Sequence, residues 1–178
     1  MGRAMFRAAV ILALATLSAT ALLTASAQEN DLAAPAIQAY GLDLVPYATV
    51  RRDDGTYRRM LIASDVLPSV VPDAPLPDGT RILMETYYRP DQVGTVFHKR
   101  KIRGKWQYGS FSGARPDLTV QPRASCLACH AGAARTDFTF TLPSIRAVAA
   151  GNAPSDFTCD RGGRSPCGAD TYRGGAAR

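Results

Sequence analysis

Two cysteines and a histidine stand within five residues in the C-terminal half of the chain. Cys126 and Cys129 are three positions apart, and His130 follows directly. Thiols at this spacing reach the two vinyl groups on adjacent edges of a haem, and the imidazole that follows then lies under the iron. The pattern therefore predicts one covalently bound haem c, with thioethers to Cys126 and Cys129 and with His130 as the iron ligand.

Three other interpretations of these cysteines remain open at this point. A thioredoxin-like redox pair would need a strand–helix–strand context that the surrounding sequence does not indicate. A zinc site built from four thiolates is a second alternative, although it leaves the position of His130 unexplained. A disulfide between the two cysteines of the motif is the third. The thiolates of the zinc alternative are those of Cys126, Cys129, Cys159 and Cys167.

The N-terminus has the pattern of a secretory signal peptide over residues 1–27. Arg3 and Arg7 are cationic, and an apolar run and the small-residue cleavage site Ala25-Ser26-Ala27 follow them. The apolar run is shorter than the roughly 20 apolar residues that a membrane-spanning helix needs. We expect cleavage before Gln28 and a periplasmic protein with no membrane anchor.

Export to an oxidising compartment also bears on Cys159 and Cys167. Gly162, Gly163 and Pro166 stand between them, so the chain can turn back on itself there. Disulfides form and persist outside the cytoplasm, and we therefore expect a local disulfide between these two cysteines. Two free thiols in a disordered tail are the alternative.

The basic charge of the chain is mild and spread out. The formal net charge is +6 at pH 7, and Lys99, Lys101 and Lys105 form a close group. A solvated strand edge explains such lysines, because they discourage edge-to-edge pairing of sheets. Without a longer basic run or a nucleic-acid-binding motif, nucleic acid is not an expected partner.

Most of the segments that would position the motif are expected to be strands. The turn Asp53-Asp54-Gly55 separates the first two, and the next three are rich in β-branched and aromatic residues, which favours an antiparallel meander. The proline-rich residues 64–80 between the two groups are expected to form a loop, because proline lacks a backbone donor. The expected strands are Tyr47–Arg52, Thr56–Ile62, Arg81–Tyr88, Val93–Ile102 and Lys105–Phe111.

A few short helices complete the expected fold, which is mainly β (α+β): an antiparallel sheet domain with a few short helices that carries one covalent haem c. The haem domain is expected over residues 28–157, and a Gly- and Arg-rich tail over residues 158–178. The expected helices are a segment around Ala34–Tyr40, a helix capped by Ser125 that carries the cysteines, and Ser144–Ala150, which Pro143 opens and Gly151 ends.

The segments LPDGTRILMETYY, KRKIRGKWQYGSF and CLACHAGAARTDFTFT occur in this order. Their order resembles that of the cytochrome P-460 family, which includes hydroxylamine-oxidising cytochrome P-460 and cytochrome c′-β. The resemblance covers residues 47–150, and its most specific part is the haem motif followed by Thr136-Asp137 and Phe140-Thr141. It implies a mainly antiparallel β domain with one covalent haem, an open distal face and, as in many members, a homodimer.

One position departs from the hydroxylamine-oxidising members. In those members a lysine on the strand after the Asp-Gly-Thr turn is bonded to the porphyrin, and Met84 stands at that place here. Methionine cannot make the lysine bond, so the sequence is in this respect more similar to cytochrome c′-β, which lacks the cross-link and binds nitric oxide. The resemblance places Met84 at the haem edge as a cofactor-binding residue.

Further side chains are candidates for contact with a haem. His98, Met60 and Met84 are candidates for a second axial ligand, and methionine ligation suits electron transfer because it raises the haem potential. The alternatives are that His98 is an exposed or hydrogen-bonded strand side chain and that the two methionines fill the core. Arginine matches the carboxylate geometry of haem propionates, and aromatic residues suit a haem pocket or an ordinary core. These candidates are Arg51, Arg52, Arg58, Arg59 and Arg135, together with Trp106, Tyr87 and Tyr108.

Three functions are therefore considered. In the first, a five-coordinate haem c held by His130 binds or oxidises a small nitrogen ligand such as nitric oxide or hydroxylamine, and the sequence leaves open whether the chain is an oxidoreductase or only a binder. In the second, both axial positions are filled and the chain passes electrons to a redox partner protein. In the third, zinc or disulfides staple a secreted binding module that has no haem. The sequence favours the first.

Overall fold

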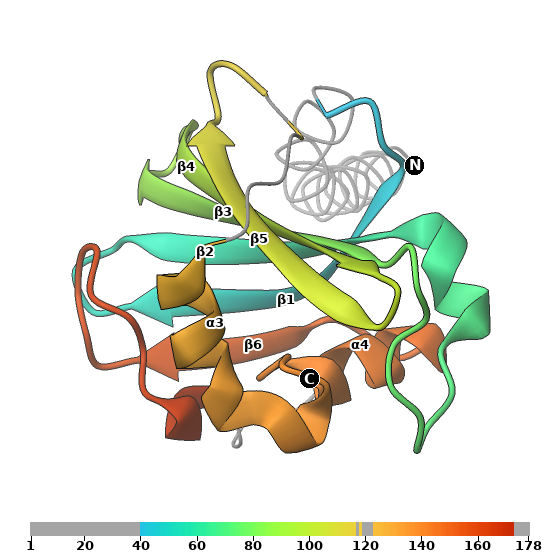
Figure 1. The fold of residues 1–178 in the computed structure, drawn as a ribbon. Helices are drawn as coiled ribbons and strands as arrows, with labels where there is room; N and C mark the ends of the chain where they lie inside the picture. The colour runs from blue at the N-terminus through green and yellow to red at the C-terminus, as the bar shows by residue number, and fades with distance from the viewer. Residues whose placement is uncertain (1–39, 117, 119–122, 173–178) are drawn as a thin grey trace, which may run out of the picture. The chain divides into compact units, whose positions relative to one another are not determined.

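The computed structural model describes residues 40–116, 118 and 123–172 (Figure 1). The expected signal peptide and almost all of the helix expected at Ala34–Tyr40 lie outside these residues. The strands are β1 (Leu44–Arg52), β2 (Tyr57–Ala63), β3 (Arg81–Arg89), β4 (Gln92–Ile102), β5 (Lys105–Ser112) and β6 (Ser155–Cys159). The helices are α3 (Ala124–His130) and α4 (Leu142–Ala149), with the 3₁₀ helices η1 (Ser64–Ser69), η2 (Ala131–Thr136) and η3 (Ala169–Tyr172).

The six strands form one sheet in the order β5-β4-β3-β2-β1-β6. Neighbours from β1 to β5 are antiparallel, which confirms the hairpin and the meander expected from the sequence. β6 pairs with β1 in parallel, so the sheet is mixed and not wholly antiparallel. The fold is thus mainly β, as expected. The sequence does not indicate β6, because Phe157 is its only large apolar side chain.

A two-residue turn sets the register of β4 and β5. Arg103 and Gly104 connect these strands with φ values of 50° and 72°. Positive φ at both positions gives a turn whose twist matches that of the flanking strands. The resulting register pairs Lys99 with Tyr108. Directly paired residues project to the same face of a sheet, so these two side chains point the same way.

A bulge in β1 contributes a further side chain to that face. The pairing of β1 with β2 shifts between Pro46 and Ala48, which leaves Tyr47 as the extra residue. Bulges of this kind re-aim a side chain. The Tyr47 hydroxyl lies 3.1 Å from Oγ1 of Thr141, and this hydrogen bond ties the start of α4 to β1.

The helices differ in detail from the expected ones. α3 begins after Arg123, which makes no side-chain cap, so Ser125 lies inside the helix and is not its cap. α4 starts two residues earlier than expected, with Pro143 in its first turn and Gly151 (φ 84°) just after its end. The proline-rich stretch is mainly loop but contains η1. None of the helices in the described ranges has the length and apolar character needed to cross a membrane.

The core lies between one face of the sheet and α4. α4 contacts β1 and η1, while α3 contacts β5 at the other end of the sheet (Figure 1). Strand side chains and two residues of α4 fill the space, since apolar burial is the main driving force for such packing. The core includes Val50, Met60, Ile62, Ile82, Trp106, Leu142, Ile145 and Phe157.

Candidate functional site

A pocket of about 360 Å³ lies on the helix-covered face of the sheet. Cys126, Cys129, His130 and Met84, the four site residues expected from the sequence, all line it. Strands β1 to β5 supply one part of its wall, and α3, the segment before α4, the disulfide loop and η3 supply the rest. The other lining residues are Tyr47, Arg58, Met60, Ile82, Phe97, His98, Lys99, Tyr108, Gly109, Ser125, Thr139, Phe140, Thr141, Pro166, Cys167 and Tyr172.

The helix that carries the two thiols has no buried residue. Cys126 is half-buried, Cys129 is exposed, and both are free thiols, so they are not joined to each other. Leu127 between them is 47% exposed. A seven-residue helix gains little stability from its own hydrogen bonds and depends on packing. α3 therefore leaves apolar and thiol groups available for a further packing partner.

A hydrogen bond to the backbone fixes the position of the proton on the His130 ring. Nδ1 of His130 lies 2.8 Å from the carbonyl oxygen of Phe138. A carbonyl only accepts hydrogen bonds, so Nδ1 carries the proton and Nε2 keeps its lone pair. Burial, followed by the charge of Lys99, lowers the pKa of His130 to about 4. The ring is therefore neutral near pH 7 and its Nε2 is a competent metal donor.

The carbonyl that orients His130 belongs to an unusual turn. Asp137 and Phe138 have φ values of 52° and 55°, a left-handed conformation that non-glycine residues seldom adopt. Nζ of Lys101 lies 2.8 Å and 3.0 Å from the two carboxylate oxygens of Asp137, and the backbone N–H of Leu76 also donates to this carboxylate. These buried contacts hold the turn, and with it the acceptor of His130.

Tyr108 places a polar atom in the wall of the pocket. Its ring centroid lies 4.9 Å from that of His130, and the residue is only 5% exposed. Its hydroxyl is buried, and no hydrogen-bond partner for it occurs within the described ranges. Burial raises the pKa of Tyr108 to about 12, so the hydroxyl keeps its proton. A buried hydroxyl normally has a partner, and a molecule in the pocket could supply one.

The charge of the pocket wall is positive. Arg58 and Lys99 are 9% and 6% exposed, and the described residues that line the pocket include no carboxylate. Arg58 stays charged, although burial lowers its pKa below the usual value. Buried cations favour a ligand that brings compensating negative charge.

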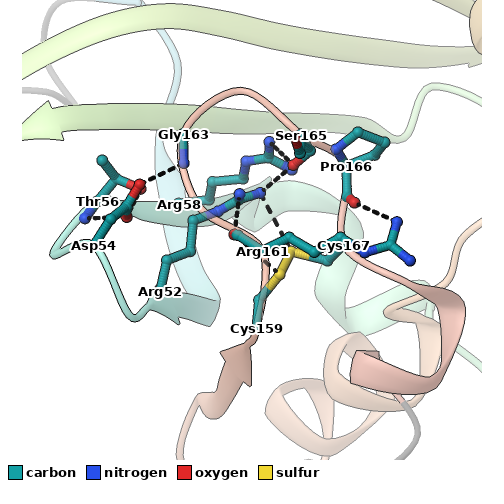
Figure 2. The surroundings of a disulfide bond; sticks show 10 residues. All are labelled: Arg52, Asp54, Thr56, Arg58, Cys159, Arg161, Gly163, Ser165, Pro166 and Cys167. Atoms are coloured by element: carbon teal, nitrogen blue, oxygen red, sulfur yellow. Dashed lines mark hydrogen bonds between the residues drawn. A yellow bond between two sulfur atoms is a disulfide. The ribbon is translucent and has the colours of Figure 1, made fainter.

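The disulfide loop contributes Pro166 and Cys167 to the wall of the pocket, and Figure 2 shows the contacts that hold this loop. Cys159 and Cys167 form the local disulfide expected from the sequence. The guanidinium of Arg52 donates to the carbonyls of Arg161 and Ser165 within the loop, and Asp54 accepts from the backbone N–H of Gly163. The loop is therefore held against β1 and its turn.

The disulfide also bears on the zinc alternative. Two of the four thiolates that this alternative needs are bonded to each other. Within the part of the chain that the structure describes, no three histidine, cysteine or acidic side chains gather in a way that could hold a metal ion. A four-thiolate zinc site is thus contradicted.

Some of the remaining residues that the sequence suggests for contact with a haem line the pocket, and others lie elsewhere in the fold. Met60 lines the pocket together with Met84. His98 also lines the pocket. Its pairing with Leu83, however, places it on the face of the sheet opposite to that of Lys99. The centroid of its ring lies 5.3 Å from that of Phe111. Lys99 and Lys101 are buried, so the expected solvated edge is wrong for both. The reason is that their ammonium groups have partners inside the fold.

Of the five candidate arginines, only Arg58 lines the pocket. Arg59 binds buried Glu85 with Nε 2.7 Å from the carboxylate, and Tyr87 donates to the same carboxylate. Arg51 is exposed, and Arg135 borders a separate pocket of about 720 Å³. Trp106 is a core residue beneath Lys99. Two lining residues, Tyr47 and Tyr172, were not predicted from the sequence. Tyr47 projects toward the pocket because of the bulge in β1. No motif or periodic pattern around Tyr172 indicates a role in a site.

Comparisons with known proteins add no family to this geometry. No protein-family model matches the chain. The curated proteins contain no match to it either.

Proposed function

We propose that this chain is an exported c-type cytochrome with one haem, bonded to Cys126 and Cys129 and ligated by His130. The observation that carries the proposal is the hydrogen bond from Nδ1 of His130 to the Phe138 carbonyl. Metal-ligating histidines commonly donate their second ring N–H in this way, which fixes the tautomer and orients the ring. The proposal also rests on the resemblance to cytochrome P-460.

The described residues fit a haem in four ways. Apolar side chains such as Ile82 and Phe97 would pack against a porphyrin, whose faces are apolar. Arg58 would pair with a propionate, for which its guanidinium has matching geometry. The hydroxyl of Tyr108, which has no partner among the described residues, would gain a hydrogen bond. α3 would also gain a packing partner, because the thiols of Cys126 and Cys129 line the pocket.

We infer that the ligand is a small nitrogen species such as nitric oxide or hydroxylamine. When bound, the haem iron would supply the coordination of such a ligand and any electron exchange with it. The chain's own part is to hold the iron from one side with a neutral imidazole and to keep the pocket wall largely apolar. Met84 in the wall, where the oxidising members of the family have a lysine, favours binding of the ligand over its oxidation.

A specific observation supports a second candidate, a six-coordinate electron carrier. Met60 and Met84 both line the pocket, and a thioether is a common second ligand in electron-transfer cytochromes. In that case the iron would have no open position, and the function would be exchange of electrons with a redox partner protein.

Absorption spectra of the full chain, made together with a haem-attachment system and purified from the periplasm, separate these proposals. A high-spin spectrum that changes when nitric oxide is added supports the ligand-binding function. An unresponsive low-spin spectrum that becomes high-spin in Met84→Leu or Met60→Leu supports the electron carrier. Protein without haem under the same conditions contradicts both.

Variants of the two histidines test the assignment of the ligand. His130→Ala should leave the haem attached through its thioethers but change the spectrum of the iron. His98→Gln is the matched control, because it alters the only other histidine of the chain. We expect its spectrum to equal that of the parent. A reversed result would move the axial ligand to His98.

A further inference from the structure

A buried lysine shares the hydrogen-bond acceptor of His130. Nζ of Lys99 donates to the Phe138 carbonyl at 2.9 Å, the same oxygen that accepts from Nδ1 of His130. It also donates to Oγ1 of Thr139 at 2.6 Å and lies 4.1 Å from the centroid of the Trp106 ring. These three contacts fix the ammonium group beside the oriented imidazole.

Burial of this lysine is expensive for the fold. Lys99 is 6% exposed, and burial lowers its pKa to about 7, with Lys101 acting in the same direction and Asp137 opposing. An apolar side chain of similar volume at this position would avoid the desolvation of an ammonium group. Tyr108 and Met84, which share this wall of the pocket, show that large uncharged residues are accommodated there.

The shared carbonyl has a definite electronic consequence for His130. A carbonyl oxygen has two lone pairs, so it can accept from both groups at once. The ammonium group withdraws electron density from this oxygen, and its positive charge opposes movement of the Nδ1 proton toward the carbonyl. The imidazole therefore keeps its proton tightly and is a weaker electron donor through Nε2 than it would be with an unshared acceptor.

We propose that Lys99 is a positioning residue that weakens the electron donation of His130 to the iron and thereby favours the ferrous state. The inference rests on the proposed function, because it concerns the same axial ligand. A weaker donor and a nearby positive charge both disfavour the more highly charged ferric iron, so the two effects have the same sign.

The test is the reduction potential of the haem-loaded full chain, measured by spectroelectrochemistry at pH 6, where the ammonium group is charged. Lys99→Met keeps the length of the side chain and removes its charge and donors. We expect the ferric-to-ferrous ratio at a fixed potential to rise at least tenfold, which is a fall of about 59 mV for a one-electron couple. The matched control Lys105→Met removes an exposed lysine of the same sheet and should change the potential far less.

A second measurement begins with the parent protein, and that part of it does not depend on whether a variant folds. In the ferrous parent protein, the iron–histidine stretching frequency in resonance Raman spectra should be that of a neutral, weakly hydrogen-bonded imidazole, and it should rise in Lys99→Met or Lys99→Gln. An imidazolate-like frequency in the parent would overturn the inference. So would a potential in Lys99→Met equal to that of Lys105→Met. Neither result would remove the haem itself, whereas a chain that takes up no haem would refute the proposed function.

Discussion

Breaking the buried ion pair between Lys101 and Asp137 should strongly destabilise the fold around the site. Their side chains are 6% and 10% exposed, and Nζ lies 2.8 Å from the nearer carboxylate oxygen. Removing one partner of a buried ion pair leaves an uncompensated charge, which typically costs about 3–5 kcal/mol of stability. Asp137→Asn keeps an acceptor for Lys101 and Leu76, so we expect the lower end, about 3 kcal/mol.

Asparagine is chosen because it removes the charge of Asp137 without disturbing the backbone conformation. Asp137 has a φ of 52°, and asparagine adopts this left-handed conformation as readily as aspartate does. The substitution therefore adds no strain of its own. With an m-value of about 2 kcal/mol per molar urea, a loss of about 3 kcal/mol lowers the unfolding midpoint by about 1.5 M. Fluorescence of Trp106, the only tryptophan of the chain, reports the transition.

Two comparisons make the outcome decisive. Asp156→Asn removes the acid of an exposed pair with Arg51 at 4.0 Å, and it should cost less than about 1 kcal/mol. In a Lys101→Met background, Asp137→Asn should lose most of its effect, since no ammonium is then left unpaired. The reasoning is refuted if Asp137→Asn costs no more than Asp156→Asn, or if the effects of the two changes at 101 and 137 simply add.

Three further outcomes follow from the geometry of the disulfide loop and of the pocket. Replacing both Cys159 and Cys167 by serine should lower the free energy of unfolding by about 2 to 3 kcal/mol, as loop-closure entropy predicts for a sequence separation of 8; urea titration measures it, and an unchanged midpoint would contradict it. Hydrogen bonds from Thr56, then from Gly163, lower the pKa of Asp54. Stability from this carboxylate is therefore present above the usual carboxyl pKa and is lost as the pH falls through the lower folded value. The difference in Tm between the parent and Asp54→Asn should accordingly be visible at pH 7 and vanish in acid, and a constant difference would refute this. In the proposed haem-loaded protein, Arg58→Leu should lower the reduction potential more than Arg51→Leu, because of these two only Arg58 lines the pocket; equal shifts would argue against Arg58 as the propionate partner.

The strands could be predicted from sequence because their signals are local. The turn at Asp53-Asp54-Gly55 and the dense aromatic and β-branched residues from Arg81 to Phe111 are sufficient to define five antiparallel strands. β6 has no such signal, and its position depends on pairing with β1 across a long stretch of chain. Long-range pairing of a short polar strand is decided by tertiary contacts and not by propensity.

The residues of the site also differ in whether the local sequence is sufficient to predict them. The spacing of Cys126, Cys129 and His130 is local, so the sequence alone indicates them. The lysines could not be placed correctly, because charge predicts exposure and only the folded chain provides the Phe138 carbonyl and the Asp137 carboxylate. The left-handed turn that orients His130 likewise depends on the partner that Lys101 supplies.

The attachment of haem to the two thiols of α3 is tested most directly by mass spectrometry of tryptic peptides from the mature protein. The account predicts that the peptide Ala124–Arg135 carries the added mass of one haem and that both cysteines resist alkylation. The protein must be produced together with an active haem-attachment system. The account is contradicted if the same peptide then lacks the added mass and carries two free thiols, a bound zinc ion or a disulfide between Cys126 and Cys129.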